Sequence, residues 1–93
     1  MTDVVIQEGM KEVRIYVTSR CGYCVMAKRL LESREIAYEA IDVSTDNDRR
    51  RWLVEASGQR TVPQIFIGDK SIGGYQELSA LDRSGDLADM LKD

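Results

Sequence analysis

The sequence predicts an α/β domain in which a small mixed sheet carries helices on both faces. Its 93 residues are enough for one hydrophobic core and too few for two of ordinary size. Apolar residues follow strand spacing and helical spacing in the order β-α-β-α-β-β-α-α. A right-handed crossover makes the first two strands parallel, and a tight turn makes the last two antiparallel.

The first four elements are predicted from the spacing of their apolar residues. Residues 13–17 alternate as in a strand, and residues 26–31 repeat at helical spacing shortly after the two cysteines. We expect the second strand over residues 36–43. Residues 44–48 supply N-cap and acidic first-turn side chains for a helix that ends at Gly58, a residue type common at helix C-caps.

The second half of the chain predicts a hairpin and two more helices. An apolar strand over residues 64–67 follows Pro63, and residues 68–70 turn the chain into a short strand over residues 71–73. The last two helices are marked by Leu78 and Leu81 and by Leu87, Met90 and Leu91, with Ser84 and Asp86 as the expected caps of the final helix.

The composition excludes several classes of function. The chain has no histidine, which removes histidine bases, Cys-His nucleophiles and His-x-x-x-His zinc sites. Its two cysteines cannot supply the four ligands of a structural zinc site within one chain. The net charge of −3 argues against a nucleic-acid partner. No stretch approaches the ~20 apolar residues of a membrane span, so we expect no membrane partner.

Residues 1–11 are predicted to form a short extension, and residues 12–93 the domain itself. The extension lacks the basic and apolar regions of a secretory signal, so we expect a cytoplasmic protein. Within the domain, residues 49–51 are three arginines that we interpret as a solvated helix face, because nearby acidic residues offset their charge. Trp52, which follows them, is expected to pack its helix onto the sheet.

Cys21 and Cys24 lie at the junction of the first strand and the first helix. The free N–H groups and the positive dipole end of a helix favour an anion, so Cys21 is predicted to be largely thiolate at neutral pH and to act as the nucleophile. Cys24, one turn further in, is less exposed and can attack a mixed disulfide on Cys21. Arg20 adds positive charge beside the nucleophile, and the Tyr23 ring can cover one side of the site. A buried structural disulfide, or half of a metal site shared by two chains, is the alternative.

Three motifs in this order resemble the glutaredoxin family. Cys21-Gly22-Tyr23-Cys24 is similar to its Cys-Pro-Tyr-Cys, Thr61-Val62-Pro63 to its Thr-Val-Pro, and Gly73-Gly74 followed by Glu77-Leu78 to its Gly-Gly-x-Asp-Asp/Glu-Leu. The resemblance covers residues 12–92. It implies a thioredoxin fold, a four-stranded mixed sheet flanked by helices, and an enzyme that uses glutathione. Gly22 in place of proline and Tyr75 in place of a smaller residue depart from the pattern.

The resemblance also implies a role for individual residues. Cys21 would be the nucleophile and Cys24 the resolving thiol. Pro63 would be cis, and Val62 would offer its backbone N–H and C=O to the cysteinyl part of glutathione. The other glutathione-binding residues would be Gln59 at the glycine carboxylate, Gly74 where the backbone comes close, Gln76 and Glu77 at the γ-glutamyl end, Thr61 along the same groove, and Arg20 and Tyr23 beside the cysteines.

The favoured function is reduction of protein disulfides and protein–glutathione mixed disulfides, with glutathione as co-substrate, by a chain expected to act as a monomer. The alternative is a [2Fe–2S] cluster bridged by two chains through Cys21, with glutathione thiols completing the ligand set. Gly22 fits this alternative, because the resemblance links the cluster to some active sites that lack the proline. A third interpretation, an electron donor reduced by thioredoxin reductase, is disfavoured because Gln59, Gly74 and Glu77 indicate a glutathione site.

Overall fold

The computed structural model describes residues 10–92, so most of the predicted N-terminal extension lies outside the described residues. The two described residues at its end pair with the other end of the domain. Met10 forms a bridge with Lys92, and the Lys11 N–H donates to the Leu91 carbonyl oxygen at 2.7 Å. No helix within residues 10–92 has the length and apolar character needed to cross a membrane.

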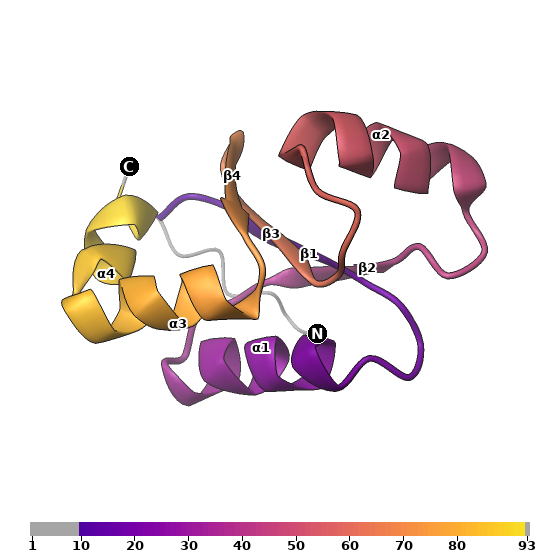
Figure 1. Ribbon diagram of the computed structural model, residues 1–93. Helices are drawn as coiled ribbons and strands as arrows, with labels where there is room; N and C mark the ends of the chain where they lie inside the picture. The colour runs from indigo at the N-terminus through magenta and orange to yellow at the C-terminus, as the bar shows by residue number, and fades with distance from the viewer. Residues whose placement is uncertain (1–9, 93) are drawn as a thin grey trace, which may run out of the picture.

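The described chain follows the predicted order of strands and helices (Figure 1). The elements are β1 (Val13–Val17), α1 (Gly22–Ser33), β2 (Glu39–Asp42), α2 (Asn47–Ser57), β3 (Gln64–Ile67), β4 (Lys70–Gly73), α3 (Tyr75–Ser84) and α4 (Asp86–Leu91).

The four strands form one sheet in the order β2-β1-β3-β4. β1 runs parallel to β2 and antiparallel to β3, and β3 and β4 form the expected hairpin. Ile15 at the centre of β1 lies between Ala40 and Ile65 in register. The sheet is therefore mixed, as the crossover and the tight turn predict.

Helices cover both faces of the sheet, with α1, α3 and α4 on one side and α2 on the other (Figure 1). Successive strand residues point to opposite faces, so Val13, Ile15 and Val17 enter the larger core while Tyr16 enters the smaller one. The larger core consists of Val13, Ile15, Val17, Cys24, Ala27, Leu31, Ile36, Ile65, Ile67, Leu78, Leu87 and Leu91. The smaller core consists of Tyr16, Val43, Leu53 and Phe66.

The second strand is shorter than predicted, because β2 begins at Glu39 rather than at residue 36. Residues 34–36 instead end α1. Glu35 takes a left-handed φ of 58°, the Ile36 N–H donates to the Leu31 carbonyl at 2.9 Å, and the Glu35 N–H donates to the Glu32 carbonyl at 3.0 Å. This pair of hydrogen bonds is a Schellman motif. Ile36 is buried by packing at the helix end and not by strand pairing.

The predicted caps of the last helix are also corrected. Ser84 is the final residue of α3, and Gly85 with φ of 87° ends α3 and starts α4. The left-handed backbone favours glycine at that point, so the cap residue between the two helices is Gly85, one residue after Ser84. The Ser84 hydroxyl still accepts a hydrogen bond from the Asp86 N–H at 3.3 Å.

Candidate functional site

Cys21 is the N-cap residue of α1. Its backbone is extended, with φ of −115° and ψ of 105°, and its Sγ accepts a hydrogen bond from the Cys24 N–H at 3.1 Å. Sulfur here takes the place of the oxygen that serine or aspartate supplies at an ordinary cap. An N-cap thiolate gains both this donor and the positive end of the helix dipole. The local geometry thus agrees with the predicted nucleophile.

The two cysteines are joined in a disulfide, with their Cα atoms 5.2 Å apart. Cys24 is 2% exposed and belongs to the larger core, whereas Cys21 is partly exposed at its edge. An incoming sulfur therefore reaches Cys21 more easily than Cys24. This difference in access is the one expected if Cys21 is the nucleophile and Cys24 the resolving thiol, and that division stays a prediction.

The turn before Cys21 is held from the neighbouring loop. The Ser19 N–H donates to the Ser44 hydroxyl at 2.8 Å, and the Ser44 N–H donates to Asp42 Oδ1 at 2.8 Å. Hydrogen bonds from Ser44 lower the pKa of Asp42 below its ordinary value. Arg20, in this turn, is exposed and has a left-handed φ of 59°.

A second segment, which precedes β3, contacts Cys21. The Val62–Pro63 peptide is cis, as the resemblance implies. The Val62 carbonyl oxygen lies 3.8 Å from Cys21 Sγ. This segment follows Gly58, which ends α2 with a left-handed φ of 74°, and leads into β3. Pairing of β3 with β1 therefore brings Val62 to the cysteine.

The third segment is the start of α3. Glu77 Oε1 accepts a hydrogen bond from the Gly74 N–H at 2.7 Å, which caps the helix. A Cβ on Gly73 would lie 2.9 Å from the Glu77 side chain, and one on Gly74 would lie 3.3 Å from the Pro63 carbonyl oxygen. Both glycines thus permit close approach. The sequence pattern indicated the glycines, but it did not show that Glu77 also caps α3.

These segments enclose a groove of about 320 Å³. Tyr75, which the sequence singled out only as a departure from the family pattern, stacks its ring on Tyr23 with centroids 6.0 Å apart. Arg20 is not among the groove-lining residues. The groove is lined by Tyr23, Gln59, Thr61, Val62, Pro63, Gly74, Tyr75, Gln76 and Glu77, which are the other non-cysteine residues predicted for glutathione together with Tyr75.

Gln64 contributes to this site although the sequence prediction used it only as the first residue of a strand. It is fully buried, and its Nε2 donates to Gln59 Oε1 and to the Thr61 carbonyl oxygen, each at 2.9 Å. The available signal was a polar residue at the start of an otherwise apolar strand.

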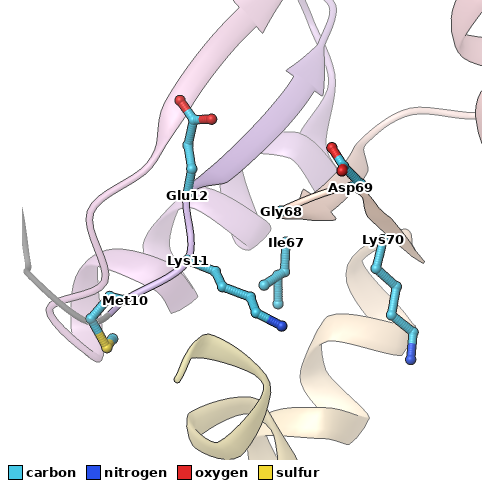
Figure 2. Close-up of a pocket in the computed structure, with 7 residues that line it drawn as sticks. All are labelled: Met10, Lys11, Glu12, Ile67, Gly68, Asp69 and Lys70. Atoms are coloured by element: carbon cyan, nitrogen blue, oxygen red, sulfur yellow. The ribbon is translucent and has the colours of Figure 1, made fainter. Parts of the chain in front are cut away.

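A separate hollow lies at the opposite end of β1 and β3 (Figure 2). Figure 2 shows Ile67 between the side chains of Lys11 and Lys70, whereas the Glu12 carboxylate points away from them. Neither cysteine lines this hollow. The cysteines are not among the lining residues of the groove either, but Val62, which lines the groove, has its carbonyl oxygen 3.8 Å from Cys21 Sγ.

Comparisons with known proteins agree with this geometry. Residues 13–72 match the sequence model of the family described as glutaredoxin. Glutaredoxin 3 of Escherichia coli strain K12 is 40% identical over 83 residues, which cover 89% of this chain and 100% of that protein. The glutaredoxin of Pseudomonas aeruginosa is 39% identical over 82 residues, which cover 88% of this chain and 98% of that protein.

Solved structures give the same result. The solution structure of a glutaredoxin from Brucella melitensis has a TM-score of 0.82 at 40% identity and covers 92% of this chain and 94% of its own. The crystal structure of a buckwheat glutaredoxin–glutathione complex has a TM-score of 0.80 at 34% identity and covers 87% of this chain and 76% of its own.

A cysteine pair at a helix start, on a four-stranded mixed sheet flanked by helices, defines a thiol–disulfide oxidoreductase of the thioredoxin fold. The chain belongs to the glutaredoxin family. It is thus an enzyme, a glutathione-dependent thiol–disulfide oxidoreductase, and the resemblance seen in its sequence is confirmed.

Proposed function

We propose that the enzyme reduces protein disulfides and protein–glutathione mixed disulfides, and that glutathione lies in the groove beside Cys21. The observation that carries this proposal is the position of Cys21 Sγ. It accepts a hydrogen bond from the Cys24 N–H at the start of α1, and it lies 3.8 Å from the carbonyl oxygen of Val62, a residue that lines the groove. A nucleophilic sulfur thus borders a groove that can hold the rest of a small thiol.

The chemistry requires only sulfur exchange. The Cys21 thiolate attacks the glutathione sulfur of a mixed disulfide, the S–S bond to the substrate protein breaks, and the protein sulfur leaves as a thiolate that takes a proton from water. The thiolate of a second glutathione then attacks the glutathione sulfur on Cys21. This step releases glutathione disulfide and restores the Cys21 thiolate. With a protein disulfide, Cys24 resolves the mixed disulfide on Cys21, and two glutathiones reduce the resulting pair.

The groove lining includes groups that complement both ends of glutathione. Glu77 lines the groove, and its carboxylate suits the γ-glutamyl ammonium, while backbone N–H groups near Gln76 suit the neighbouring carboxylate. Gln59 lies in the same lining, and its amide suits the glycine carboxylate. The buckwheat relative is described in complex with glutathione, which supports the same ligand here.

The iron–sulfur alternative remains a prediction. Within residues 10–92, no group of three or more Cys, His, Asp or Glu side chains is placed to hold a metal ion. Cys21 supplies one thiolate per chain, so a [2Fe–2S] cluster on this protein requires a second chain and glutathione thiols. The cytoplasmic location and the monomeric state likewise remain predictions.

Cys21→Ser and Cys24→Ser test the proposal with a glutathionylated peptide as substrate, and glutathione and glutathione reductase as the coupling system. Cys21→Ser is expected to abolish turnover, because the attacking thiol is lost. Cys24→Ser is expected to keep this turnover and to lose reduction of protein disulfides, because external glutathione replaces Cys24 only in the first reaction. The reverse result would make Cys24 the nucleophile. Turnover with thioredoxin reductase but not with glutathione would support the third interpretation instead.

The pKa of Cys21 tests the predicted effect of the start of α1 on this thiol. Alkylation of the reduced Cys24→Ser variant across pH reports the pKa of Cys21, which we expect well below the value of about 8.5 for a free thiol. A value near that of a free thiol would remove the role given to the start of α1.

A further inference from the structure

Gln64 is a buried polar residue with one unsatisfied atom. It is 0% exposed, and it lies opposite Tyr16 at the start of β3, followed by three apolar residues. Its Oε1 has no hydrogen-bond partner among the described residues. An unpaired buried acceptor is unfavourable. An apolar side chain would pack here without this cost, so we ask what the NH₂ group of Gln64 contributes.

The donor end is oriented by a group whose polarity is certain. Gln64 Nε2 lies 2.9 Å from the backbone carbonyl oxygen of Thr61, which can only accept. The Gln64 side chain must therefore direct its NH₂, not its oxygen, toward Thr61. The same NH₂ lies 2.9 Å from the side chain of Gln59, which must then present its oxygen to Gln64.

These two hydrogen bonds determine which way the side-chain amide of Gln59 points. Because its Oε1 faces Gln64, its own NH₂ is directed away from Gln64 as a donor group. The Gln59 backbone is held as well, since the Ser57 hydroxyl donates to its carbonyl oxygen and accepts from its N–H, each at 3.1 Å. Gln59 is exposed and lines the groove.

We propose that Gln64 is a positioning residue that orients the Gln59 amide, so that the Gln59 NH₂ binds the glycine carboxylate of glutathione. The proposal rests on the proposed function, because it assumes that glutathione occupies the groove. It adds that specificity for an anionic glycine end is determined by a buried residue that does not line the groove. Three hydrogen-bonded groups fix the direction of the Gln59 amide: the Thr61 carbonyl, the Gln64 amide and the Gln59 amide itself.

The test compares two reductants that differ only at the glycine end, glutathione and its glycine monoethyl ester. The rate of reduction of one glutathionylated peptide gives kcat/KM for each. We expect the wild type to prefer glutathione about tenfold, the scale of one hydrogen bond to a charged group. Gln59→Ala and Gln64→Met should each reduce this preference to about twofold or less, and the double variant should reduce it no further.

Two further variants separate orientation from a loss of stability. Ile65→Val perturbs the neighbouring buried position of β3 and should leave the preference unchanged. Gln64→Glu replaces the two N–H donors by at most one O–H donor, so it cannot donate to both the Thr61 carbonyl and Gln59, and the preference for glutathione should fall. Reduction of the Cys21–Cys24 disulfide by dithiothreitol, which has no glycine end, monitors the reactive thiol throughout.

The outcomes distinguish the two proposals. If Gln64→Met keeps the wild-type preference while Gln59→Ala loses it, the role of Gln64 is overturned and the proposed function stands. If Gln59→Ala also keeps the preference, the groove assignment and the role of Gln64 both fall. Should Gln64→Met not fold, the wild type and Gln59→Ala provide the comparison by NMR. The side-chain amide resonances of Gln64 should shift and exchange faster in Gln59→Ala, and unchanged resonances would overturn the inference.

Discussion

On one face of the sheet, which we call the helical face, α1, α3 and α4 pack over an apolar core that contains twelve of the described residues. On the other, α2 buries a core of four residues, and Trp52 remains 42% exposed. On this side, which we call the α2 face, Arg14 adds contacts to the smaller apolar core. Its guanidinium carbon lies 5.6 Å from the Phe66 ring centroid and 6.0 Å from that of Tyr16, and it donates to the Tyr16 hydroxyl and the Gly68 carbonyl. Cation–aromatic contacts and aromatic stacking thus supplement apolar packing on this face.

The contrast explains how the groove is built. The starts of α1 and α3, which carry Cys21 and Glu77, belong to helices packed on the helical face. The opposite wall, residues 59–63, follows α2 and is held by the hydrogen bonds of Ser57 and Gln64. One wall is therefore positioned by apolar packing, whereas the other combines the packing of Val62 with the polar contacts of Ser57 and Gln64. The expected consequences differ in stability and in ligand recognition.

The largest effect on stability is expected from a truncation on the helical face. Leu31 is fully buried, and Leu31→Ala should lower the free energy of unfolding by about 4 kcal/mol, whereas Leu53→Ala on the α2 face should lower it by about 2 kcal/mol. The smaller core lies beside the half-exposed Trp52, so it can relax around the lost atoms. Urea unfolding of both variants measures the difference. Equal losses would show that the two faces contribute alike.

Glu77 tests the wall that the helical face positions. Glu77→Ala should weaken glutathione use by about 1–3 kcal/mol, because a charged hydrogen bond is lost, and should lower stability by about 1 kcal/mol, because the Gly74 N–H loses its cap. Glu77→Gln keeps a cap acceptor and removes the charge. This variant should keep the wild-type stability but show most of the loss of glutathione use seen in Glu77→Ala.

Coupled assays with glutathione, and reduction of the disulfide by dithiothreitol, report the two contributions of Glu77 separately. We expect the dithiothreitol reaction to change little in either variant. An equal loss with both reductants would indicate that Glu77 acts on folding or on the thiol, and its assignment to the groove would be abandoned.

The smallest effect concerns Tyr38, which packs against the rim of the helical face. Burial and a hydrogen bond from its hydroxyl to Glu32 raise the pKa of Tyr38 to about 12, from its ordinary value of 10.0. The folded state therefore favours the neutral phenol. Its contribution is complete below pH 10 and is lost as the pH rises through 12.

Tyr38→Phe removes this titration. We expect a loss of about 0.5–1 kcal/mol at neutral pH, as for a partly exposed hydrogen bond, and a shallower decline of stability than the wild type between pH 10 and 12. Chemical denaturation at a series of alkaline pH values measures both. Parallel stability curves for the two proteins would exclude Tyr38 as a source of the alkaline decline.

Much of the fold was predictable from local patterns. Alternation over β1, helical spacing in α1 and the apolar run in β3 each appear within a few residues, because the spacing of side chains is a property of the strand or helix itself. The bounds of β2 were not predictable in this way. The Schellman motif after α1 uses Glu35 in a left-handed conformation, where glycine is the usual signal.

The sequence by itself determined the family and the residues capable of sulfur exchange, because Cys21 and Cys24 are adjacent to a helix start in the chain. Only the tertiary structure decided which distant groups meet that sulfur. Pairing of β1 with β3 brings the Val62 carbonyl to 3.8 Å from Cys21 Sγ, and packing beside α1 adds the start of α3. The polarity of the Gln59 amide was likewise decided there, because it depends on a backbone carbonyl and a buried side chain whose orientations no local pattern specifies.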